Sequence, residues 1–256
     1  MEREQEKETQ QLRKRFRELA DKSFRQGIFT FTGFLGLNEQ ECFWRMEEEL
    51  RYAGCEFAGG YENADRRILR FGNPTELGYE TDFPMACIHI QPLMYKFADE
   101  LSHRDFLGAL MNLGIERSTL GDIRVGDREA YLFCLESMGD FICENLRQIK
   151  HTRVTCHRTA DYREIPQKEP EKELLQVSSS RVDGVTAKVY HLSRGECLEL
   201  FRAGRMFVNG RLCENNSRLL KAGETVNARG YGKYIYQGEL GETRKGKLHV
   251  EIAVFR

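Results

Sequence analysis

The chain has 256 residues, of which 40% are hydrophobic and 31% are charged, and its formal net charge at pH 7 is −1. This composition excludes general disorder, and the length suits two modest domains or one large one. No run approaches the ~18 apolar residues of a membrane helix, and the charged N-terminal segment lacks the apolar stretch of a signal peptide. We therefore expect a soluble, cytoplasmic protein with no membrane partner.

The charge is divided unevenly along the chain. From Gln176 onward there are 14 Lys/Arg and 8 Asp/Glu, a net of +6, whereas the preceding residues carry a net of −7. This division suggests that the C-terminal part binds a polyanion. The eight cysteines include no CxxC pair and no Cys/His quartet with zinc-ligand spacing. We therefore expect free structural thiols in a reducing compartment, no metal site and no cofactor.

Residues 1–80 are expected to form an N-terminal helical and α/β region. Residues 5–26 are highly charged with sparse apolar positions, which is typical of a surface helix. A second helix is predicted over 39–54, with Gly54 placed to end it. Residues 55–71 then have the pattern of a strand, a glycine-containing turn and a second strand.

Residues 81–160 alternate between short strands and helices in the order βαββαβ. Gly126 and Asp127 form a dipeptide that favours a hairpin turn between the second and third strands. This order predicts a ferredoxin-like, RRM-like middle domain. Tyr131 and Phe133 alternate on the third strand, where RNA-recognition modules can carry stacking aromatics. Because the full aromatic signature of such modules is absent, we expect these two rings to be core residues.

Residues 161–176 contain two prolines and many acidic residues, and are predicted to be a linker. Residues 177–256 are expected to form a small α+β domain. A short helix begins near Asp183, and a second begins at Ser193, which forms a capping-box pattern with Glu196. Asn209-Gly210 is a tight-turn signature between strands.

Basic side chains recur through this C-terminal segment beside helix starts and turns, positions suited to phosphate binding. We expect several arginines to contact phosphates, Asp183 to hold neighbouring basic side chains and cap the first helix, and Tyr231 and Tyr234 to stack on a base or ribose. Asn209 would set the turn. The candidate RNA-binding residues are Arg181, Asp183, Ser193, Arg194, Arg205, Asn209, Gly210, Arg229, Gly230 and Lys233.

Five separated motifs resemble a known domain. They are Arg181-Val182-Asp183, Ser193-Arg194, Gly204, Val208-Asn209-Gly210 and Arg229-Gly230-Tyr231-Gly232-Lys233. In this order they resemble the S-four RNA-binding domain, named for a small-subunit ribosomal protein. Val182 and Glu224 stand where that domain usually has Leu and Asp, and Met206-Phe207 replaces a more typical small or basic pair.

Upstream, GGYENADRRILRF and HRDFLGALMNLGIERSTLGDI resemble the YlmH family of bacterial proteins, as does the closing GETRKGK. The resemblance implies a ribosome-associated, non-enzymatic protein that binds structured RNA: ribosomal RNA of the large subunit, tRNA or both. It also implies roles in the rescue of stalled large subunits and in cell division. It leaves the oligomeric state open.

Two other functions stay open at this point. One is an RNA-modifying enzyme, a pseudouridine synthase or an rRNA methyltransferase, targeted by the C-terminal domain. No GRLD-like catalytic loop and no glycine-rich cofactor turn was found upstream of the linker. The other is a protein-only scaffold whose basic face docks on an acidic partner. No residue is assigned a catalytic role.

Overall fold

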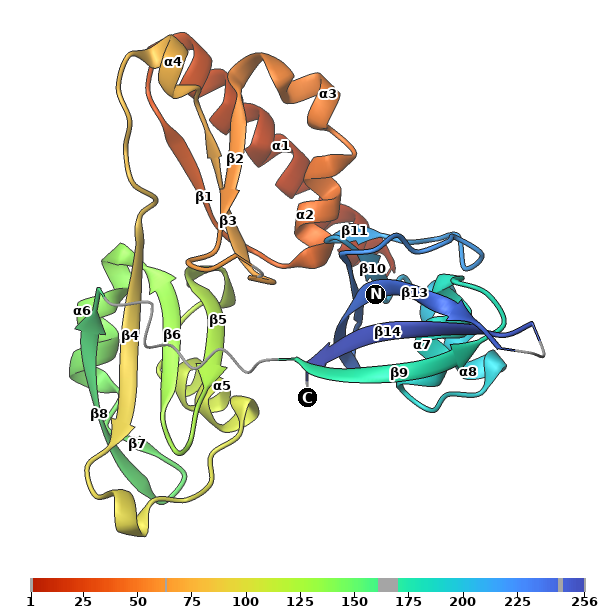
Figure 1. The fold of residues 1–256 in the computed structure, drawn as a ribbon. Coiled ribbons are helices and arrows are strands. Elements are labelled where there is room, and N and C mark those ends of the chain that lie inside the picture. Colours follow the sequence, from red (N-terminus) through yellow and green to blue (C-terminus); the bar gives the residue numbers. More distant parts are fainter. Residues whose placement is uncertain (1, 63, 161–169, 244–245, 256) are drawn as a thin grey trace. The chain divides into compact units, whose positions relative to one another are not determined.

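The computed structural model describes residues 2–62, 64–160, 170–243 and 246–255. The chain divides into two compact units, Met1–Pro166 and Gln167–Arg256 (Figure 1). Both units combine helices with antiparallel sheets, so the protein belongs to the mixed α and β class. Across the described residues, every helix is too short or too polar to cross a lipid bilayer.

The first unit begins with the sheet β1-β3-β2, which is covered by helices. α1 matches the predicted N-terminal helix, and its Phe16, Leu19 and Ala20 pack against Phe43 and Phe71. The helix expected over 39–54 is broken into α2, α3 and a 3-10 turn that ends before Gly54. The elements are α1 (Glu2–Gln26), β1 (Thr30–Leu35), α2 (Leu37–Trp44), α3 (Glu47–Leu50), η1 (Arg51–Ala53), β2 (Cys55–Ala58), β3 (Arg67–Phe71) and α4 (Pro74–Leu77).

A second sheet in the same unit has the strand order β5-β6-β4-β8-β7, with all pairs antiparallel. α5 and α6 pack on one face of it through a core that includes Ile88, Leu110 and Ile142. The element order β4-α5-β5-β6-α6-β8 is the predicted βαββαβ order. The bounds are β4 (Met85–Pro92), η2 (Tyr95–Phe97), α5 (His103–Asn112), η3 (Arg117–Thr119), β5 (Leu120–Val125), β6 (Ala130–Leu135), η4 (Glu136–Met138), α6 (Gly139–Asn145), β7 (Gln148–Ile149) and β8 (Thr152–Thr159).

The two sheets of the first unit share a buried contact. Phe34 and Ile68 of the first sheet pack against Cys87, Tyr131 and Phe133 of the second. Both rings that alternate on β6 are therefore core residues, as expected, with Tyr131 5% and Phe133 0% exposed. Residues 1–80 and 81–160 thus have separate sheets, but they form one compact unit because apolar side chains fill the space between the sheets.

Residues 59–62 and 64–67 join the two sheets. The Tyr61 hydroxyl donates to Asp122 at 2.7 Å, and the Asp65 N–H donates to the same carboxylate. The Arg66 guanidinium donates to the carbonyl oxygens of Phe34, Arg117 and Leu120. Burial lowers the pKa of Arg66 from its usual value. This segment therefore has a structural role in the first unit.

The second unit begins with a strand where the sequence suggested a linker. Residues 171–176 belong to β9 (Glu171–Val177), which pairs along its whole length with β14 (Leu248–Phe255). The linker predicted over 161–176 is therefore too long at its C-terminal end, because β9 is part of the sheet. Residues 161–169 lie outside the described residues, as do Arg244 and Lys245 of the basic turn in GETRKGK.

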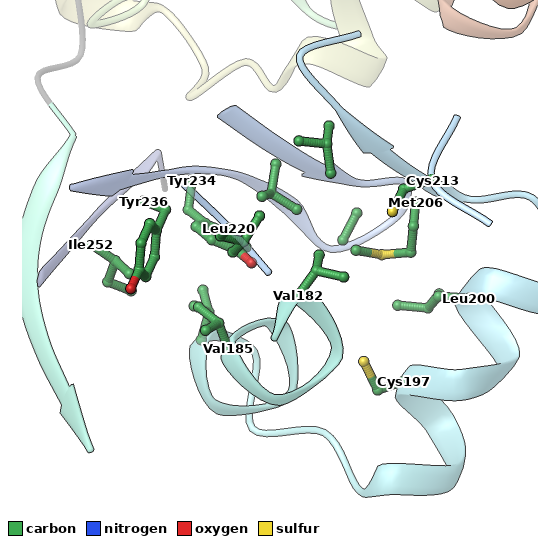
Figure 2. Packing of buried hydrophobic residues seen from close by; sticks show 14 of the residues in the cluster. Val182, Val185, Cys197, Leu200, Met206, Cys213, Leu220, Tyr234, Tyr236 and Ile252 are labelled. Carbon is green, nitrogen blue, oxygen red and sulfur yellow. The ribbon is translucent and has the colours of Figure 1, made fainter. Parts of the chain in front are cut away.

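The sheet of the second unit has the order β11-β10-β12-β13-β14-β9. Two helices pack on it, with Val182 and Val185 from the first and Cys197 and Leu200 from the second pointing toward the sheet (Figure 2). The bounds are α7 (Val182–Val189), α8 (Arg194–Arg202), β10 (Met206–Val208), β11 (Arg211–Leu212), β12 (Glu224–Ala228) and β13 (Gly232–Glu242).

All eight cysteines lie in the described part of the chain and are free thiols. Five of them are buried, and burial raises the pKa of Cys87 and of Cys134 to about 12. A thiol with a raised pKa stays protonated and behaves as a small apolar group. The described residues contain no group of three or more His, Cys, Asp or Glu side chains arranged to hold a metal ion.

Candidate RNA interface

A groove of about 600 Å³ lies between α7, the start of α8 and the residues that follow β9. Its cationic lining comes from Arg181, Lys188, Arg194 and Lys247, with His191 beside them. Asp183 is the only carboxylate among the lining residues described. The remaining lining residues are uncharged: Gln176, Val177, Ser178, Ser179, Gly184, Ala187, Leu192 and Cys197.

The single carboxylate in this groove is already neutralised by the protein. Two nitrogens of the Arg181 guanidinium donate to Asp183, Nε at 3.1 Å and Nη2 at 2.6 Å. Asn216 Nδ2 and the Gly184 N–H donate to it as well. Partial burial opposes ionisation, but these donors hold the pKa of Asp183 below its usual value. Asp183 therefore positions Arg181. The expectation that Asp183 caps the first helix is wrong, because Arg181 occupies the N-cap position of α7.

Ser193 and Arg194 stand at the start of α8. Ser193 Oγ accepts from the Glu196 N–H at 3.2 Å, and Glu196 accepts from the Ser193 N–H at 2.7 Å, which confirms the predicted capping box. Hydrogen bonding of the Glu196 carboxylate to the side chain and backbone of Ser193 lowers its pKa. Arg194 is exposed at the first helical position, where the positive end of the helix dipole adds to its own charge. Ser193 thus shapes the helix end, and Arg194 supplies the charge.

A second basic cluster surrounds the turn between β12 and β13. The Arg205 guanidinium donates to the Arg229 carbonyl oxygen, and the Arg229 N–H donates to the Arg205 carbonyl at 2.9 Å. Gly230 has φ +92°, and a Cβ there would lie 2.3 Å from Arg205 Nη2. The positive φ favours glycine at this turn, and the tip of the Arg205 side chain lies close beside it. Both arginines are exposed.

An aromatic contact links this cluster to the end of α7. The Tyr231 ring, which is 45% exposed, lies 5.9 Å from the Tyr190 ring. Tyr190 ends α7 and directly precedes His191, which lines the groove. The groove and the β12–β13 turn are thus neighbours on the second unit. Tyr231 is exposed enough to stack on a base.

Tyr234 differs from expectation. Tyr234 is 0% exposed, and its hydroxyl lies 2.9 Å from that of Thr186 in the core. The prediction that Tyr234 stacks on a base or ribose is therefore wrong: on β13, residue 234 faces the helices while its neighbours face away. Lys233 is half-buried, with its ammonium 5.3 Å from the centre of the Phe255 ring.

Asn209 and Gly210 form the predicted tight turn between β10 and β11. Asn209 has φ +52° and Gly210 φ +77°, the left-handed values of such a hairpin. Asn209 Oδ1 accepts from the Thr225 N–H at 2.9 Å and so fastens the turn to β12. Within the second unit, the side chain of Asn209 therefore has a structural use.

The structure assembles the sequence-derived residues into two groups. Arg181, Asp183 and Arg194 line the groove, whereas Arg205, Arg229 and Gly230 surround the β12–β13 turn. Lys188, His191 and Lys247 also line the groove but were not singled out from the sequence. Helical spacing could have found Lys188, because it follows Gly184 by four residues on α7. Lys247 arrives from a distant turn and carries no local signal.

Comparison with known proteins points to a second segment of the chain, in the first unit. Residues 79–163 match the family model described as "Putative RNA-binding domain in YlmH". The chain is 29% identical over 202 residues to the Bacillus subtilis (strain 168) protein named "Ribosome-associated protein quality control protein P2". The match covers 77% of this chain and 76% of that protein. The chain therefore resembles YlmH proteins in sequence over residues 79–163.

A solved structure supports the YlmH-like fold. The "Cell division protein ylmH from Streptococcus pneumoniae" aligns with a TM-score of 0.50 and 18% identity, over 62% of this chain and 95% of that one. At this identity the likeness concerns the fold alone. The family match falls on the middle sheet and its helices, whereas the basic groove lies in the second unit.

Proposed function

We propose that this protein binds structured RNA through the basic face of its second unit and that it catalyses no reaction. The observation that carries the proposal is the groove of α7 and α8: Lys188, Arg194 and Lys247 line it, and Arg181 already neutralises its one described carboxylate. Such a surface attracts phosphates and offers guanidinium forks to them. The exposed Tyr231 adds a ring on which an unpaired base can stack.

We also propose that residues 177–256, preceded by β9, are an S-four-like domain. The five motifs support this assignment, since they supply the N-cap of α7, the start of α8, the glycine just after α8, the β10–β11 turn and the β12–β13 turn. The order and pairing of β4, β5, β6 and β8 likewise support a ferredoxin-like assignment of the middle domain.

The cellular role follows from the relatives by inference. The Bacillus subtilis relative is named for ribosome-associated protein quality control, and the Streptococcus pneumoniae structure for cell division. We infer a cytoplasmic, ribosome-associated protein that binds rRNA of the large subunit, tRNA or both, and takes part in the rescue of stalled large subunits. A role in cell division would then be an indirect consequence of its action in translation, and it would need no separate binding site on the protein.

The test is in-cell ultraviolet crosslinking of the tagged full-length protein, with sequencing of the attached RNA. The wild type is compared with Arg194→Glu/Arg229→Glu, which reverses one charge in each basic group. The control is Lys172→Glu/Arg202→Glu, which makes the same charge change at exposed positions of β9 and α8 outside both groups. We expect crosslinks on large-subunit rRNA or tRNA that disappear in the first variant and persist in the control. Scattered crosslinks, or equal loss in both variants, would overturn the proposal.

A further inference from the structure

A second basic groove, of about 580 Å³, lies in the middle domain of the first unit. One wall is α5, and the other is the segment from the end of α6 through β7. Gly108 and Ala109 keep the α5 wall low. Three cationic side chains line the groove, those of Arg104, Arg147 and Lys150. The carboxylate of Asp105 also lines it.

The carboxylate of this groove does not neutralise the two arginines. Asp105 accepts from Lys150 Nζ at 2.8 Å and from the N–H and the hydroxyl of Ser102. These donors lower the pKa of Asp105 to about 2, with Lys150 the largest contributor. Arg104 and Arg147 are exposed, and neither forms an ion pair with any residue that the structure describes. Two unneutralised guanidinium groups therefore face one groove.

Side-chain amides of the groove add hydrogen-bond acceptors. Asn145 Nδ2 donates to the Phe141 carbonyl at 2.8 Å, and Gln148 Nε2 donates to the Lys150 carbonyl at 2.7 Å. The nitrogen of each amide thus donates within the protein, and the side-chain carbonyl oxygen of each is left to accept a hydrogen bond from a ligand. A ribose 2′-hydroxyl can donate to such an oxygen, and DNA lacks that hydroxyl.

The aromatic residues on the opposite face of the same sheet are not available to RNA bases. Phe133 is fully buried against the first sheet, and the Tyr131 ring stacks on His89 at 4.4 Å with an interplanar angle of 4°. The matched segment 79–163 is also acidic as a whole, with 10 Lys/Arg and 13 Asp/Glu. RNA contact by this segment therefore needs a place where positive charge is concentrated.

We propose that the groove between α5 and β7 is a second RNA-contact site, in which Arg104 and Arg147 bind backbone phosphates. The inference rests on the proposed RNA-binding function and extends it to the first unit. It assigns the RNA contact of the middle domain to the helical side, and not to the sheet face that RNA-recognition modules use. Asp105 holds Lys150 at the rim of the groove as a third cation.

The test measures how the affinity of the full-length protein for purified large-subunit rRNA depends on salt. Arg104→Gln/Arg147→Gln removes two charges from the groove, and Lys22→Gln/Arg51→Gln removes two exposed charges elsewhere on the first unit. We expect the groove variant to flatten the log–log salt slope by about 1.8 and to weaken binding at least tenfold at about 0.1 M salt. In the groove variant, the photo-crosslinks between RNA and peptides from residues 103–113 and 145–150 should also disappear.

A third variant, Lys188→Gln/Arg194→Gln, separates this inference from the proposed function. If the groove variant and the first-unit control give the same slope and affinity, the inference is overturned, whatever the third variant does. If the groove variant loses affinity while the third variant binds as the wild type does, the inference holds and the site in the second unit is overturned. Losses in both variants support both sites.

Discussion

The Tyr61 hydroxyl donates to the Asp122 carboxylate at 2.7 Å, and this bond joins the turn before β3 to β5 of the middle sheet. The same carboxylate accepts the N–H groups of Asp65 and Arg66. Burial raises the pKa of Tyr61, and the charge of Asp122 adds to the increase, so the phenol stays protonated and remains a donor. One carboxylate thus organises the segment that couples the two sheets.

Tyr61→Phe should lower the free energy of unfolding by about 1–2 kcal/mol, because a partly buried charged acceptor loses a donor. Tyr52→Phe is the matched control, since the Tyr52 hydroxyl also donates to a carboxylate, that of Asp21, but at the surface. The control should change stability by less than about 0.5 kcal/mol. Urea unfolding monitored by circular dichroism checks both. Equal effects of the two substitutions would contradict the structural role of Tyr61.

Gly60→Ala should destabilise the first unit more than Gly114→Ala. A Cβ at Gly60 would lie 2.1 Å from the Phe133 ring, whereas a Cβ at Gly114 would meet nothing within 4 Å. Both glycines have positive φ, so both alanines carry backbone strain of about 1 kcal/mol. Overpacking adds about 1–3 kcal/mol at Gly60 alone. Thermal unfolding of the two variants isolates the packing contribution, and identical melting temperatures would refute it.

Asp183→Asn should reduce stability at neutral pH and have less effect in acid. The folded pKa of Asp183 lies below its usual value. Its contribution is therefore fully present above the unfolded pKa of about 3.9, and it is lost as the pH falls through the folded value. We expect a deficit of about 1–3 kcal/mol at pH 7. Denaturant titrations from pH 7 downward should show this deficit shrinking below about pH 4. A deficit that stays constant with pH would exclude the ion pair with Arg181 as its source.

Tyr231→Ala and Tyr234→Phe should separate RNA binding from stability. Tyr231 is 45% exposed, so its removal should weaken RNA binding by about 1–3 kcal/mol with little change in unfolding. Tyr234→Phe removes the buried bond to Thr186 and should cost about 1 kcal/mol of stability while leaving RNA affinity unchanged. Filter binding and thermal unfolding of each variant test the pair. Unchanged binding of Tyr231→Ala would remove the stacking role.

Lys188→Gln/Arg194→Gln should flatten the salt dependence of RNA binding by about 1.8, the slope expected from two lost phosphate contacts. Both side chains line the groove of the second unit. Lys172→Gln/Arg202→Gln, at exposed positions that do not line it, should keep the wild-type slope. Fluorescence anisotropy over a range of salt concentrations measures the slopes. The groove would lose its assigned role if the two variants gave the same slope.

Local pattern was sufficient where an element buries one regular face. α8 buries one face, and its capping box at Ser193 appears where the sequence placed it, as does the turn at Asn209-Gly210. β9 was missed because it is an edge strand, whose pairing comes from β14 and whose pattern is mostly polar. Of its residues, only Val177 is fully buried in the core. A strand stabilised mainly by backbone pairing leaves little apolar signal.

The sequence by itself determined the short-range features of this protein: helix ends, tight turns, the division of charge and the motifs that resemble known families. Only the tertiary structure decided which charges act together. Lys247 reaches the groove of Lys188 and Arg194 from a turn more than fifty residues away, and Arg104 meets Arg147 across a groove of the middle domain. It also buried Tyr234 while leaving Tyr231 exposed. Charge density and exposure depend on distances between elements, and these distances are set by core packing.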